Sequence, residues 1–145
     1  MSNILIVGLD GSESGSRALA YAKRLASLIP DCTLELVYVI EWTPYSFQTP
    51  EENASRHKRR EQEIAVATSR VIDPAIAALH SEGFTANGRV MHGDAAELLN
   101  LVAVEEKADQ IVVARSSRGG ITSRLFGSVT ANLVMNASVP VTVVN

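Results

Sequence analysis

Ile4-Leu5-Ile6-Val7 is an unbroken apolar run near the start of the chain, and Ile111-Val112-Val113 is a second run of the same kind. Successive residues of a strand face opposite sides of a sheet, so a strand that is apolar at every position must be covered on both sides. Strands of this kind lie in the middle of parallel sheets that carry a helix layer on each face. We therefore expect both runs to be central strands of an α/β protein.

Helical patterns alternate with short β-type runs along the rest of the chain. One helix follows Ser12, a good N-cap, and ends before Pro30; another follows Asp94, and the last begins at Ser128. The alternation predicts an α/β fold with a doubly wound five-stranded parallel sheet, strand order 3-2-1-4-5, and helices on both faces. The predicted strands are Asn3–Leu9, Thr33–Ile40, Thr85–Met91, Gln110–Ala114 and Val139–Val144.

Two segments are harder to assign. The stretch from Glu41 to Ser55 contains two prolines and three aromatic residues, and we interpret it as a long loop. Asp73-Pro74 interrupts a helical pattern, so either a helix kinks there or a new helix begins with Asp73 as its N-cap. In the last helix we expect an inward-facing stripe at Val129, Leu133, Val134 and Ala137.

Composition restricts the function classes. The chain has 145 residues, 46% of them hydrophobic, and a net charge of −3, which is typical of a single globular domain spanning residues 1–145. No apolar run approaches the roughly 18 residues of a membrane span, and we expect a cytoplasmic protein. The mild acidity argues against a nucleic-acid partner. The histidines show no metal-ligand spacing, and the lone Cys32 is expected to be structural.

The last third of the chain has the layout of an anion site. A strand at Gln110–Ala114 runs into a loop of small residues, and Gly127-Ser128 opens the next helix, where free backbone N–H groups attract phosphate. From residue 110 to the end there are three arginines and no Asp or Glu, so positive charge gathers on this segment. These features indicate a phosphate-bearing ligand.

Asp10 follows the first strand, at the sheet edge where open α/β sheets bind ligands. One interpretation is a polar contact to that ligand. The other is a carboxylate that only shapes the turn, since Asp is common in turns.

Several motifs together resemble one known family. They are Gly8-Leu9-Asp10-Gly11-Ser12, Val37-Tyr38-Val39-Ile40, His92-Gly93-Asp94-Ala95-Ala96, and Gly127-Ser128-Val129 followed by the strand at residues 139–144. In order and spacing they resemble the universal stress proteins over the whole chain. In the ATP-binding branch of that family the loop pattern is G-x2-G-x9-G-[ST]. By position, the resemblance implies Asp10 and Val39 at the nucleoside, Val113 and Ala114 at the ribose edge, and Ser117, Arg118, Gly127, Ser128 and Val129 at the phosphates.

The chain departs from the family pattern at two positions, because Ala114 and Ser117 replace the two leading glycines. If those backbones need a positive φ, each side chain costs about 1–2 kcal/mol. Alternatively, the methyl group is tolerated and the Ser117 hydroxyl itself donates to a phosphate. Restoring both glycines tightens ATP binding in the first case and weakens it in the second.

The resemblance implies a regulatory module of the stress response that binds ATP, ADP or AMP, with Mg²⁺ arriving on the nucleotide. No general base is evident beside the loop, so we do not expect an enzyme. The alternative is an interaction protein of the same fold that binds no nucleotide. In both cases we expect a homodimer formed through Val139–Val144, an apolar edge strand.

Overall fold

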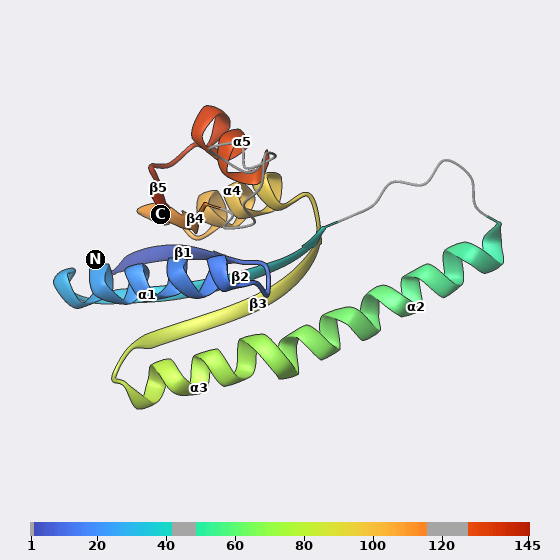
Figure 1. Ribbon diagram of the computed structural model, residues 1–145, viewed down its shortest axis with the longest axis horizontal. Helices are drawn as coiled ribbons and strands as arrows, with labels where there is room; N and C mark the ends of the chain where they lie inside the picture. Colours follow the sequence, from blue (N-terminus) through green and yellow to red (C-terminus); the bar gives the residue numbers. More distant parts are fainter. Residues whose placement is uncertain (1, 42–48, 116–127) are drawn as a thin grey trace.

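The computed structural model describes residues 2–41, 49–115 and 128–145, and its strands form one parallel sheet (Figure 1). The order is β3-β2-β1-β4-β5, as predicted, and every neighbouring pair is parallel. The strands are β1 (Asn3–Leu9), β2 (Cys32–Glu41), β3 (Thr85–Gly93), β4 (Gln110–Ala114) and β5 (Val141–Val144). The predicted Val139 and Pro140 thus precede β5, because proline lacks the N–H that a paired strand donates.

Alternation along the central strands separates two cores. Ile6 faces one core while Leu5 and Val7 face the other, and all three side chains are fully buried. Ile111 and Val112 divide in the same way on β4. Burying one such side chain contributes about 1.5–3 kcal/mol, so the two apolar runs stabilise both layers of the sandwich.

Helices cover both faces, as expected. The core on one face includes side chains of α4 (Ala95–Glu105) and α5 (Ser128–Asn136), and the core on the other includes side chains of α1 (Glu13–Leu28) and α3 (Asp73–Ser81). Both α1 and α4 begin at side-chain caps: Ser12 Oγ accepts from the Ser14 N–H, and Asp94 Oδ2 accepts from the Glu97 N–H. These caps place two helix N-termini beside the carboxyl ends of the strands.

The region after β2 differs from its prediction. A helix, α2 (Pro50–Ala67), begins inside the expected loop, while residues 42–48 lie outside the described part. Thr49 and Glu52 form a reciprocal capping box and Pro50 occupies the first turn, where a missing N–H costs nothing. The stretch Thr49-Pro50-Glu51-Glu52 is a local signal for a helix start. It was missed because the prolines and aromatic residues around it favoured a loop.

The kink interpretation of Asp73-Pro74 is closer to the structure than the new-helix interpretation. A π-helical turn, η1 (Thr68–Ile72), joins α2 to α3, so the three follow one another as one long rod (Figure 1). Asp73 has helical dihedral angles and heads α3, and no side-chain cap precedes that helix. A widened turn accommodates the missing proline N–H without ending the rod.

One expectation for α5 is wrong and the expectation for Cys32 agrees with the structure. Val134 on α5 was predicted to face the core but is 54% exposed, because Leu133 takes the inward position. Burial raises the pKa of the Cys32 thiol, with Asp109 and Asp31 adding to the shift, which agrees with a structural cysteine.

In the described part of the chain, no helix combines the length and the apolar character needed to cross a bilayer.

Candidate functional site

A cavity of about 170 Å³ opens at the carboxyl ends of the central strands. It brings together five of the residues predicted for the site, which come from β1, β2, β4 and α5. They are Asp10, Val39, Val113, Ala114 and Val129. Ser128 is exposed at the first position of α5 and does not line the cavity, and the predicted Ser117, Arg118 and Gly127 lie outside the described residues.

The wall is apolar over most of its area, with a few polar side chains among the lining residues. Leu9, Val39, Leu99 and Val113 supply the apolar part, whereas Asp10, Ser14 and Thr130 supply hydroxyl and carboxylate groups. Pockets of this mixed kind hold a flat apolar body and orient it through a few polar contacts.

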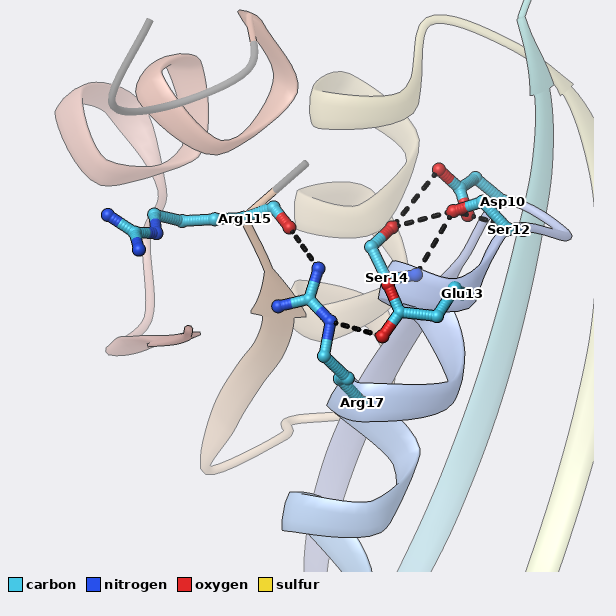
Figure 2. A network of polar contacts seen from close by, with 6 residues as sticks. All are labelled: Asp10, Ser12, Glu13, Ser14, Arg17 and Arg115. Carbon is cyan, nitrogen blue, oxygen red and sulfur yellow. Dashed lines mark hydrogen bonds and ion pairs between the residues drawn. The ribbon is translucent and has the colours of Figure 1, made fainter. Parts of the chain in front are cut away.

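Asp10 shapes the turn that carries it. Its Oδ1 accepts from the Ser12 N–H at 2.9 Å and from Ser12 Oγ at 2.5 Å, and Ser14 Oγ lies 3.5 Å from Oδ2 (Figure 2). The carboxylate is nevertheless exposed and lines the cavity. The two interpretations of Asp10 are therefore compatible, because the turn bonds hold the carboxylate in place and its remaining lone pairs face outward.

Gly11 completes this turn with a φ of +79°, a conformation that L side chains rarely adopt. A Cβ at this position would lie 2.8 Å from the hydroxyl oxygen of Tyr38 on β2. The turn that holds Asp10 is therefore pressed against the neighbouring strand, and only glycine fits it without strain.

Arg17 is a residue that the sequence interpretation missed. Its Nη2 donates a 2.6 Å hydrogen bond to the backbone carbonyl of Arg115, the residue that leaves β4 (Figure 2). Its Nε lies 2.9 Å from Glu13 Oε1 as an ion pair without hydrogen-bond alignment. The Arg115 N–H in turn donates to the Val144 carbonyl at 2.8 Å. Arg17 and β5 thus bond the carbonyl and the N–H of Arg115, the residue that leads into the predicted phosphate loop.

Glu41 is the second missed residue. It ends β2, lines the cavity, and lies two residues after Val39, so both occupy the same face of the strand. Burial raises the pKa of Glu41 and the charge of Asp94 adds to the shift, while the backbone N–H of Ala95 at the start of α4 opposes it. The sequence carries no local signal for Glu41 at the cavity. A glutamate next to a segment rich in proline and aromatic residues is easily interpreted as part of a loop.

The strain expected at Ala114 is not found. Within the described residues, the positive φ values outside glycine belong to Asp31 and Lys107, and Ala114 ends β4 in extended conformation. The methyl group of Ala114 therefore lies at the cavity without a backbone penalty, and the alternative of a strained, positive φ at this position is wrong.

In the same described ranges, no group of three or more His, Cys, Asp or Glu side chains is placed to hold a metal ion.

The sequence profile of the Universal stress protein family matches residues 1–145. The chain belongs to the universal stress protein family. A curated relative is the universal stress protein Rv1636 of Mycobacterium tuberculosis strain H37Rv, which is 29% identical over 97% of this chain and 94% of its own. The family assignment agrees with the resemblance that the motifs indicated.

Solved members of the family share the fold. The universal stress protein UspA from Lactobacillus plantarum superposes with a TM-score of 0.82 at 19% identity, over 99% of this chain and 97% of its own. Two further structures contain nucleotides: a universal stress protein in complex with cAMP (TM-score 0.63, 23% identity, 99% and 97% coverage) and a family member from Arabidopsis thaliana with AMP bound (0.63, 18%, 98% and 90%).

Proposed function

We propose that this protein binds an adenine nucleotide in the cavity at the carboxyl ends of β1, β2 and β4, and acts as a regulatory module of the stress response. The observation that carries the proposal is the convergence of Asp10, Val39, Val113, Ala114 and Val129 on one cavity from four separate elements. The relatives solved with cAMP and AMP support the same ligand class.

The wall chemistry matches the parts of a nucleotide. Val39 and Leu99 offer apolar contact to a flat base, and Asp10 offers a carboxylate to ribose hydroxyls. The start of α5 at Ser128 supplies N–H groups and a positive helix end for phosphates. Mg²⁺ would arrive bound to the phosphates of ATP.

We further propose binding without rapid turnover. No histidine lines the described part of the cavity, and the two carboxylates that do, Asp10 after β1 and Glu41 at the end of β2, come from other elements than α5, where the phosphates are proposed to bind. A general base needs a free acceptor within reach of the attacking water. An ATPase assay that finds multiple turnovers per minute would contradict this.

Calorimetric titration with ATP, ADP and AMP tests the proposal on a matched pair of α5 variants. Val129→Trp places an indole in the cavity and should abolish binding, whereas Met135→Trp changes a side chain that is 79% exposed on the same helix and should leave binding intact. Unchanged affinity in Val129→Trp would place the nucleotide elsewhere.

The alternative is an interaction protein of the same fold that binds no nucleotide and acts through its dimer surface at β5. This strand is last in the sheet order and its four residues are each only partly buried. An apolar edge of this kind is an association site. Mass spectrometry of gently purified protein separates the two functions, because co-purified ATP, ADP or AMP is expected only from the first.

A further inference from the structure

A second cavity, of about 430 Å³, lies on the other face of β2, and we call it the α2 groove. Successive residues of a strand face opposite sides of a sheet: Tyr38 and Ile40 line the α2 groove, whereas Val39 and Glu41 line the first cavity. The opposite wall belongs to the second half of α2 and to η1, in the rod that runs along β3 and extends past its carboxyl end (Figure 1). Among the described residues, none lines both cavities. The volume is typical of small-molecule sites, so the groove is a separate place for a ligand.

The middle of the α2 groove is mostly aliphatic. Ile40 of β2, Val66 of α2 and Val71 of η1 line it, beside the ring of Tyr38. Val66 is 49% exposed although it lines the groove. An alkyl chain lying here removes apolar surface from water, which is favourable. The groove therefore favours a ligand with an aliphatic body.

Two cationic side chains flank the aliphatic part. Arg59 on α2 and Arg70 on η1 line the groove about three helical turns apart. Within the described ranges, neither guanidinium forms an ion pair with a carboxylate. Glu63 is the acidic residue of the lining, and its Oε2 lies 3.8 Å from Nε2 of His92 on β3. The lining thus carries more positive than negative charge, and both guanidinium groups are available to an anion.

We propose that the α2 groove binds an organic monocarboxylate with an unbranched aliphatic chain, the chemistry of a medium-chain fatty acid. The chain lies against Ile40, Val66 and Val71, and the carboxylate accepts hydrogen bonds from a flanking guanidinium, whose planar fork matches carboxylate geometry. An alkylammonium ion of the same length buries the same apolar surface but brings its charge against the arginines. Because this groove and the first cavity lie on opposite faces of β2, the inference does not rest on the proposed function.

Calorimetric titration with decanoate tests the proposal, with decylammonium and butyrate as comparison probes. Decanoate should bind at sub-millimolar concentration, and the other two at least tenfold more weakly, since one reverses the charge and the other lacks most of the chain. Arg59→Met and Arg70→Met should each weaken decanoate binding by about three- to fivefold, because ion pairs of exposed groups are modest. Lys58→Met is the matched control: it removes the same charge beside Arg59, from an exposed residue that does not line the groove, and should bind as the wild type does.

A second set of variants locates the chain. Val66→Glu puts a carboxylate into the aliphatic part and should abolish decanoate binding. Ala65→Glu, at the preceding exposed position of α2, should stay within about threefold of the wild type. Val129→Trp fills the first cavity and should leave decanoate binding unchanged. Circular dichroism should show that all the variants are folded.

The inference is overturned if decanoate does not bind at millimolar concentration, or if decanoate and decylammonium bind equally. Binding that is unchanged in both arginine variants removes the role of the guanidinium groups and overturns it too. Binding that survives in Val66→Glu, or is lost in Val129→Trp, places the ligand outside the α2 groove. None of these results bears on nucleotide binding in the first cavity, which the titrations with ATP, ADP and AMP decide separately.

Discussion

The guanidinium of Arg17 on α1 and the backbone carbonyl of Arg115, 98 positions apart in sequence, are joined by a 2.6 Å hydrogen bond. This contact ties the first helix to the point where β4 ends and the predicted phosphate loop begins (Figure 2). Because the Arg115 N–H donates to the Val144 carbonyl of β5, both backbone polar groups of Arg115 are bonded. We therefore expect Arg17 to affect the candidate site through the backbone position of Arg115.

Replacing Arg17 should weaken nucleotide binding with little effect on the fold. Arg17→Ala removes one hydrogen bond from a charged donor, worth about 1 kcal/mol for a partly buried group, and we expect roughly a fivefold loss of ATP affinity. Arg24→Ala, an exposed position on the same helix, is the control and should bind normally. Calorimetry on both variants checks this, and equal affinities would show that the tether does not matter for binding.

Ala114→Gly should not tighten binding. Since Ala114 has no positive φ, glycine relieves no strain there; it only adds flexibility to the end of β4. We expect a loss of about 0.5–1 kcal/mol in the free energy of unfolding and an ATP affinity within about threefold of the wild type. A tenfold gain in affinity would mean that the bound backbone differs from the one described.

Gly11→Ala should destabilise the protein by strain and by a clash. Gly83→Ala is the matched control, because Gly83 also has a positive φ but no atom lies within 4 Å of its Cβ position. The control should lose about 1–2 kcal/mol from backbone strain alone, and Gly11→Ala should lose more. In a Tyr38→Phe background, which lacks the atom 2.8 Å from the new Cβ, the excess should shrink. Urea unfolding of the four variants and their parents measures it; an excess unchanged by Tyr38→Phe would exclude the clash.

Arg89→Met should cost more stability than its partial exposure suggests. Arg89 on β3 bonds the buried Glu35 at 3.2 Å and Glu106 at 2.8 Å, and its loss leaves the Glu35 carboxylate, whose side chain is 8% exposed, without its cationic partner. We expect a loss of about 2–3 kcal/mol, below the range for fully buried pairs because Arg89 is 35% exposed. Glu106→Gln removes only the negative charge of the outer, more exposed contact and should cost less than about 1 kcal/mol. Equal losses in urea unfolding would contradict this division.

The edge of β5 should mediate self-association. We expect wild-type protein to be dimeric in light scattering at tens of micromolar, because β5 ends the sheet with an apolar edge. Val141→Glu should shift the mass to that of a monomer, whereas Met135→Glu on the exposed face of α5 should not. Circular dichroism should show that both variants are folded. A wild-type monomer at this concentration would remove the proposal.

Much of the fold could be predicted because its signals are local. A fully apolar strand such as Ile4–Val7 indicates by itself a central position in the sheet. Ser12 and Asp94 indicate helix starts, because each side chain accepts a hydrogen bond from the backbone N–H two or three residues later. The start of α2 at Pro50 was missed although its capping box is equally local, because prolines and aromatics nearby are more common in loops.

The candidate site likewise contains residues that could be predicted from the sequence and residues that could not. Asp10 could be placed from sequence, since it follows a strand whose carboxyl end lies at the ligand-binding edge of the sheet, and Val39 could be placed through the family resemblance. The backbone angle of Ala114, the exposure of Val134 and the contact between Gly11 and Tyr38 could not, because each depends on how neighbouring elements settle against one another.

The sequence by itself determined the parallel α/β architecture, the strand order and the sheet edge that carries the site, because apolar periodicity and caps act over a few residues. Only the tertiary structure decided that Arg17 bonds the Arg115 carbonyl and that Glu41 and Ala95 line the same cavity. Arg17 and Arg115 are 98 positions apart, and contacts over such separations form only when the sheet has brought the elements together.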